Sequence, residues 1–146
     1  MSTDVTVETT IARPRAEVWR YTTDWRNDPT WIGAVNEAQL VTPGEFGVGS
    51  QVSRTASFVG RCFEYVNEVV DYEPESRLGM KSVKGPFPMT VTYEFEDADG
   101  GGTSVRIHAA GDASGFYRAA GPMLNPMVKR GIAGDLGRLK RELESG

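Results

Sequence analysis

The feature that most constrains this chain is one long helical pattern at its C-terminal end. From Pro126 onward, apolar residues recur at steps of four, four, three and four: Val128, Ile132, Leu136, Leu139 and Leu143. At about 100° per residue these side chains fall within one arc of about 80°, which predicts an amphipathic helix roughly 28 Å long. Asn125 is a suitable N-cap, and Pro126 suits the first helical position because it loses no hydrogen bond there. Such a helix needs an apolar surface to cover.

The segments before this helix alternate between apolar and polar residues, as half-buried strands do. The alternation predicts strands over residues 5–11, 35–41, 51–59, 61–72, 78–83, 89–95 and 105–109. After the first strand, Pro14 suits the start of a short helix that ends before Asp24. Pro29 disfavours a helical conformation at Asp28, so we expect a second short helix or a tight turn near Trp31. Runs of strands with segregated helices are typical of the α+β class.

A predicted hairpin shows which side chains share a face of the sheet. If Val59 and Gly60 form a two-residue turn, Arg54 lies opposite Tyr65. The same register pairs Val52 with Asn67, Ala56 with Phe63 and Phe58 with Arg61. Further inward residues follow from the later strands and the start of the helix: Met89, Val91, Tyr93, Ile107, Ala109, Met123, Leu124, Met127 and Val128. The reverse face carries Cys62 with several Ser, Thr and Glu residues and is expected to face solvent.

Composition excludes several classes of protein. The 146 residues suit a single domain over residues 1–146, which can bury about two-thirds of its unfolded surface. A net charge of −4 argues against a nucleic-acid partner, because phosphate contacts require a clustered positive surface. No apolar run approaches the roughly 18 residues of a membrane span. The N-terminus lacks a signal-peptide pattern and Cys62 has no partner for an intrachain disulfide, so we expect a cytoplasmic protein.

Several short motifs, taken in order, carry a resemblance to a known family. They are Ala12-Arg13-Pro14-Arg15-Ala16-Glu17-Val18-Trp19, the segment from Asp24 through Pro29 to Trp31, Phe46-Gly47-Val48-Gly49, Asp71-Tyr72-Glu73-Pro74, Gly102-Thr103 and Leu139-Lys140-Arg141-Glu142-Leu143-Glu144. Their order and spacing resemble the helix-grip fold of the START-related superfamily. Its bacterial members are often called polyketide cyclase/dehydrase and lipid-transport proteins. The likeness spans nearly the whole chain, and it is specific to the fold rather than to a ligand.

The resemblance implies a curved seven-stranded antiparallel sheet around the long C-terminal helix, with two short helices after the first strand and a pocket between sheet and helix. The candidate ligand-binding residues are Arg54, Phe58, Phe63, Tyr65, Asn67, Met89, Val91, Tyr93, Ile107, Met123 and Met127. A dry pocket of about 300 Å³ would cost on the order of 7 kcal/mol. We therefore expect the pocket to be hydrated through polar groups, filled by a ligand, or collapsed.

The polar residues of the inward face leave open what they do. A buried guanidinium needs a partner, and Asp135, at the edge of the helix's apolar stripe, is the predicted partner of Arg54. A structural role and a ligand-anchoring role both fit Arg54. The side chains of Trp25 and Trp31 are expected to pack under the short helices, and their position near the pocket mouth leaves a binding role open.

Other residues bear on metal binding and catalysis. His108 is out of phase with its apolar neighbours and Cys62 faces outward, so neither a metal site nor a Cys–His pair is expected. Gly131, Gly134 and Gly137 lower helix propensity. Close approach to the sheet and room for a ligand would both explain them.

Two classes of function follow. The first is binding or carriage of a small hydrophobic ligand, such as a lipid, a polyketide or another aromatic molecule, without a cofactor. The alternative is a polyketide cyclase/dehydrase-like enzyme using acid/base catalysis in the same pocket. Arg54 would then stabilise an oxyanion and Tyr65 or Tyr93 would donate a proton. The inward face lacks a His and a close carboxylate pair, and a free tyrosine with a pKa of about 10 is a poor base, so binding is favoured.

A third class, an interaction protein, would need an exposed apolar patch. The sequence does not visibly encode such a patch. It also predicts no oligomeric state.

Overall fold

The strands form one sheet in the computed structural model, which describes residues 3–113 and 115–145. Within these residues seven strands pair in the order β1-β7-β6-β5-β4-β3-β2. Their bounds are β1 Thr3–Ile11, β2 Val35–Leu40, β3 Gln51–Phe58, β4 Arg61–Glu73, β5 Arg77–Lys84, β6 Met89–Ala98 and β7 Gly102–Gly111. Every hydrogen-bonded pair of strands is antiparallel. The predicted antiparallel sheet is confirmed.

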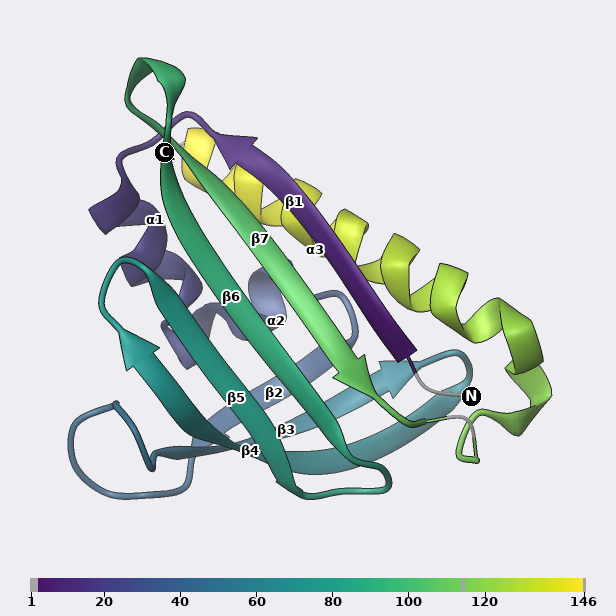
Figure 1. Cartoon of the computed structure of the whole chain (residues 1–146). Helices are drawn as coiled ribbons and strands as arrows, with labels where there is room; N and C mark the ends of the chain where they lie inside the picture. The colour runs from purple at the N-terminus through teal and green to yellow at the C-terminus, as the bar shows by residue number, and fades with distance from the viewer. Residues whose placement is uncertain (1–2, 114, 146) are drawn as a thin grey trace.

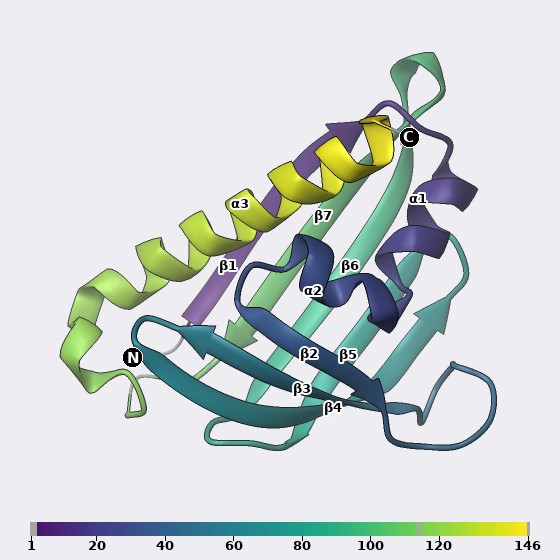
Figure 2. The ribbon, with the colours of Figure 1, turned by 180° about the vertical axis from the view of Figure 1, so that it is seen from behind.

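The helical elements are α1 Arg15–Thr22, η1 Trp25–Asn27, α2 Asp28–Trp31, η2 Asp99–Gly101, η3 Arg118–Met123 and α3 Leu124–Ser145. The α-helices lie on one face of the sheet, whereas η2 forms the turn between β6 and β7 (Figures 1 and 2). Figures 1 and 2 show the sheet curling toward α3, with α1 and α2 on the same concave side as α3. This is the helix-grip arrangement that the resemblance implied. None of the helices in the described part of the chain has the length and hydropathy that a membrane span requires.

The predicted second short helix near Trp31 is confirmed as α2, but two local predictions about helix starts were wrong. The long helix begins at Leu124, so Asn125 and Pro126 lie inside its first turn. Proline is tolerated there because the first N–H groups of a helix have no intrahelical partner. Asp28 has helical dihedral angles, φ −51° and ψ −47°, although it precedes Pro29. Its carboxylate is bonded to Arg54, and this tertiary contact outweighs the local preference.

The predicted hairpin is confirmed residue by residue. Val59 and Gly60 form its turn with φ angles of 50° and 74°, the left-handed values of a type I′ turn. Arg54 pairs with Tyr65 in β4, and Ala56 pairs with Phe63. The inward face of β3 and β4 is therefore the one that the sequence predicted.

The densest core lies under the C-terminal half of α3 and beside α1. Leu136 and Leu139 of α3 are fully buried there, in one cluster with Ile11 and Val18. The Trp19 ring packs edge-on against Phe95 at 5.2 Å between centroids. Side chains therefore fill the space between the sheet and the C-terminal half of α3.

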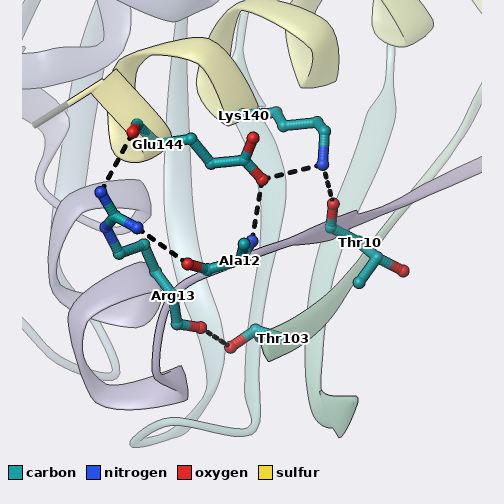
Figure 3. A network of polar contacts seen from close by, with 6 residues as sticks. All are labelled: Thr10, Ala12, Arg13, Thr103, Lys140 and Glu144. Carbon is teal, nitrogen blue, oxygen red and sulfur yellow. Dashed lines mark hydrogen bonds and ion pairs between the residues drawn. The ribbon is translucent and has the colours of Figure 1, made fainter. Parts of the chain in front are cut away.

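Polar contacts tie the end of α3 to the end of β1 (Figure 3). Glu144 Oε2 accepts hydrogen bonds from the Ala12 backbone N–H and from Lys140 Nζ, both at 2.8 Å. Lys140 also donates to the Thr10 carbonyl at 2.5 Å, and Arg13 Nη2 donates to the Glu144 carbonyl at 3.0 Å. These contacts hold the C-terminal half of α3 in place from outside the core.

Glu144→Gln is expected to reduce the loss of stability in acid. The contacts to Lys140 and to the Ala12 N–H hold the pKa of the Glu144 carboxyl below its usual value. A carboxyl whose folded pKa is lowered adds stability above its unfolded pKa, and this stability is lost as the pH falls through the folded pKa. Between about pH 6 and about pH 3 the Tm, followed by circular dichroism, should therefore fall less in Glu144→Gln than in the wild type. Glu142→Gln is the control, and an equal fall in wild type and Glu144→Gln would contradict the prediction.

Candidate functional site

A cavity of about 470 Å³ lies between the concave face of the sheet and the first half of α3. This volume is within the range of about 300–1,000 Å³ that is typical of ligand pockets. Most of its wall is apolar: Ala56, Phe58, Phe63, Met80, Val91, Ile107, Ala109, Val128 and Ile132. The cavity wall therefore suits contact with an apolar molecule better than contact with water.

Most of the predicted ligand-facing residues line this cavity. They are Arg54, Phe58, Phe63, Tyr65, Asn67, Met89, Val91, Tyr93 and Ile107. Met123 and Met127 are not among the lining residues, and Met123, in η3, is 58% exposed. Because α3 begins at Leu124, the stripe that faces the cavity runs through Leu124 and Val128, and the two methionines lie off it. Their prediction as inward residues was wrong.

The polar floor of the cavity is built around an ion pair. Arg54 of β3 is only 6% exposed, and its Nε donates to Asp28 Oδ2 of α2 at 2.7 Å. The predicted pairing with Asp135 was therefore wrong. Asp135 instead accepts from the Gly33 backbone N–H at 2.9 Å and from Arg138 Nη2 at 2.5 Å. Two separate ion pairs thus flank the cavity.

The ion pair leaves part of the guanidinium available. Burial raises the pKa of the Asp28 carboxyl, and the adjacent guanidinium of Arg54 opposes that rise. Arginine keeps its proton in proteins, so the guanidinium stays positively charged beside this carboxyl. Among the described residues only Asp28 bonds to Arg54, and it does so through Nε. The two terminal nitrogens of the guanidinium can donate to a bound molecule.

Two tyrosine hydroxyls share the cavity with Arg54. Burial raises the pKa of Tyr65, and the Arg54 guanidinium opposes this while Asp28 and Asp135 add to it. Burial also raises the pKa of Tyr93, and the nearby Asp28 carboxylate raises it further. Both hydroxyls therefore stay protonated at neutral pH. They are suited to hydrogen bonding with a ligand and are not bases.

Three buried polar atoms that belong to cavity-lining residues have no hydrogen-bond partner in the described part of the chain. They are Trp31 Nε1, Asn67 Oδ1 and the Tyr117 hydroxyl. Leaving such an atom unbonded costs about 1–3 kcal/mol, so these are polar groups beside the cavity that the described residues leave unsatisfied. Asn67 was among the predicted site residues, whereas Trp31 was expected to pack under the short helices, with a binding role left open. Trp31 does pack, edge-on against Tyr93 at 5.9 Å between centroids.

An aromatic cluster lies at the end of the cavity near the start of α3. It contains Phe58, Phe63, Phe87, Phe116 and Tyr117. These residues come from the β3–β4 hairpin, the β5–β6 loop and the segment before η3, which Figure 1 shows at the same end of the molecule. The guanidinium of Arg61 covers the Phe116 ring from outside, 3.9 Å from its centroid. Sequence reasoning missed Phe87, Phe116 and Tyr117, because their segments have no periodic pattern.

The helix glycines have different surroundings. A Cβ at Gly131 would lie 3.4 Å from Phe58 Cε1, so this glycine leaves room beside the cavity. A Cβ at Gly134 or Gly137 would meet only guanidinium atoms of Arg138 or Arg141, at 3.6 Å or more. Of the two explanations left open by the sequence, room near a ligand fits Gly131, and close approach to the sheet fits neither Gly134 nor Gly137.

The described residues contain no group of three His, Cys, Asp or Glu side chains placed to share a metal ion. His108 lies on the far side of the sheet from the cavity lining and contacts Asp4 Oδ1 through Nε2 at 2.7 Å. Cys62 is exposed.

Several solved structures have this fold. A START superfamily protein from Mycobacterium smegmatis superposes with a TM-score of 0.83 at 12% identity, covering 97% of each chain. The Zhui aromatase/cyclase from Streptomyces sp. R1128 gives a TM-score of 0.80 at 18% identity, covering 99% of this chain and 94% of that one. A protein from Thermus thermophilus gives 0.80 at 19% identity, covering 97% of each chain. At these identities the likeness shows the fold.

The sequence itself matches a family model. The model describes the polyketide cyclase/dehydrase and lipid transport family, and it matches residues 2–144. No match was found among curated proteins. The family and the fold support hydrophobic-ligand binding or a cyclase role in general terms. Because the match spans nearly the whole chain, this protein belongs to the polyketide cyclase/dehydrase and lipid transport family.

Proposed function

We propose that this protein binds and carries a small hydrophobic molecule of about two or three aromatic rings in the cavity under α3. The observation that carries the proposal is a cavity of about 470 Å³ with apolar walls and a few unbonded polar atoms. At ~24 cal/mol per Å³, leaving it empty and dry would cost on the order of 10 kcal/mol, which rivals the stability of a typical domain. An occupant removes most of that cost.

The volume and the walls favour an aromatic occupant. A cavity of about 150 Å³ holds one benzene molecule, so this one has room for about three such rings. Phe58, Phe63 and Tyr117 present ring edges and faces, which suit a flat molecule better than a flexible acyl chain. Polyketide-derived and other fused-ring compounds meet this description. The cytoplasmic location stays a prediction of the sequence.

A second candidate function is cyclase/dehydrase-like catalysis. The observation that favours it is that Arg54, Tyr65 and Tyr93 line one cavity, with Arg54 directly opposite Tyr65 in the pairing of β3 with β4. Arg54 would stabilise a developing oxyanion, and a tyrosine hydroxyl would donate a proton to it. Tyr65→Phe or Tyr93→Phe should then abolish turnover of a bound polyketide-like substrate while leaving its affinity within about threefold. Unchanged turnover in both variants would remove this candidate.

Val91→Phe is expected to lower the affinity for a hydrophobic probe by at least about tenfold, because the added ring occupies space in the cavity that Val91 lines. The probe is N-phenyl-1-naphthylamine, which is uncharged and fluoresces when it leaves water. Val70→Phe is the control, since Val70 is 46% exposed and absent from the cavity lining. Native mass spectrometry of purified wild type should also show a bound small molecule that Val91→Phe lacks. Full probe binding by a folded Val91→Phe protein would contradict the proposal.

A further inference from the structure

The cations that line the cavity are already paired. Arg54 is paired with Asp28, and Arg138 is paired with Asp135. The two cations are therefore matched by two carboxylates. A ligand that brought a negative charge would find no free positive charge among the lining residues to neutralise it.

The two tyrosines indicate whether the cavity stabilises a negatively charged oxygen. A tyrosinate at Tyr65 or Tyr93 would place a negative charge beside Arg54, as an anionic ligand would. Burial disfavours that charge most strongly, and the carboxylates of Asp28 and Asp135 disfavour it further. Arg54 opposes these effects without overcoming them, since the pKa of both tyrosines is raised. A phenolate or carboxylate ligand would meet the same field.

The guanidinium determines which polar group of a ligand fits. The terminal nitrogens of Arg54 can only donate, so they need an acceptor oxygen. A carboxylate and a primary amide both offer such an acceptor. What distinguishes them is the negative charge of the carboxylate, which the paired cations of the cavity do not neutralise.

We infer that the cavity selects uncharged aromatic molecules whose polar end carries an acceptor oxygen, and that it rejects carboxylates of the same shape. Asp28 is the specificity-determining residue, because it neutralises the cation that would otherwise hold an anion. This inference rests on the proposed function and narrows its ligand class. It predicts different affinities for uncharged aromatic molecules and for aromatic carboxylates, which an apolar wall alone would not distinguish.

The test compares three probes of matched shape on the wild-type protein by isothermal titration calorimetry near neutral pH. They are 2-naphthamide, which is uncharged, 2-naphthoate, which carries one negative charge, and 2-methylnaphthalene, which has no polar group. We expect 2-naphthamide to bind at least about tenfold more tightly than 2-naphthoate. Equal or tighter binding of 2-naphthoate overturns the inference and leaves the proposed function standing. If none of the three binds, the proposed function fails and the inference fails with it.

Asp28→Asn tests the origin of the selectivity. Asparagine can still accept the hydrogen bond from Arg54 Nε but leaves the guanidinium charge uncompensated. The ratio of the two affinities should then shift toward 2-naphthoate by at least about tenfold. Asp97→Asn is the matched control, since it removes one carboxylate whose side chain is 78% exposed. An unchanged ratio in folded Asp28→Asn overturns the role of Asp28, and if this variant does not fold, the wild-type comparison still decides the selectivity.

Discussion

Replacing Asp28 with Leu is expected to lower the free energy of unfolding by about 3–5 kcal/mol, because it leaves a buried guanidinium without a counter-charge. Both members of the pair are almost fully buried, and the bond between them is 2.7 Å long. Arg54 cannot lose its proton to escape the penalty. Urea denaturation at neutral pH measures the loss. The exposed pair of Arg106 with Glu8 provides the comparison, and Glu8→Leu should cost no more than about 1 kcal/mol.

Arg54→Leu should be less harmful than Asp28→Leu, and its cost should depend on pH. Without Arg54, burial raises the pKa of the Asp28 carboxyl unopposed, so this group can take up a proton. A carboxyl with a raised folded pKa is most favourable below its unfolded pKa, and that stability is lost as the pH rises through the folded pKa. The deficit of Arg54→Leu against wild type should therefore shrink as the pH is lowered toward about 4. The deficit of Asp28→Leu should lack this relief.

The double variant completes the cycle. With both residues changed to Leu, no unpaired charge remains in the cavity floor, so most of the lost stability should return. Losses that simply add would show that the two residues do not stabilise the fold as a pair. Binding of the uncharged probe should weaken in the double variant, because the donors of Arg54 are gone.

The sequence predicted the sheet face but not the partner of Arg54. The hairpin through Val59 and Gly60 is local, so its turn and its alternation determined which residues face inward. Asp28 comes from a helix of four residues, which is too short to show a period. Asp135 was expected from its helical phase alone. Asp135 does line the cavity, but its carboxylate accepts hydrogen bonds from the Gly33 backbone N–H and from Arg138.

The aromatic cluster at one end of the cavity shows a second limit of sequence reasoning. Phe87 lies in the β5–β6 loop, and Phe116 and Tyr117 precede η3. Neither segment repeats at the period of a strand or helix, so nothing in the sequence assigned a direction to these rings. Their ring centroids lie 5.5 and 6.1 Å from that of Phe87, because the fold brings two irregular segments to one end of the sheet. Residues that meet only through topology require the structure.

The long helix has two halves with different tasks. Leu136, Leu139 and Leu143 are buried in the core, whereas Val128 and Ile132 line the cavity. The apolar stripe of α3 therefore packs into the core at its C-terminal end and lines the cavity at its N-terminal end. The polar contacts of Glu144 and Lys140 strengthen the anchored end. Stability and ligand affinity should then respond to different positions along one helix.

Leu139→Ala is expected to lower the free energy of unfolding by about 2–5 kcal/mol and to leave probe affinity within about twofold, since this side chain is fully buried away from the cavity. Val128→Ala should cost about 1 kcal/mol, because the lost methyl groups face a space that already exists. In Val128→Ala the affinity for N-phenyl-1-naphthylamine should instead change several-fold, because the smaller side chain enlarges the cavity beside α3. Urea denaturation and probe titration of both variants give the two quantities. Equal stability losses with equal affinities would mean that α3 acts as one uniform packing element.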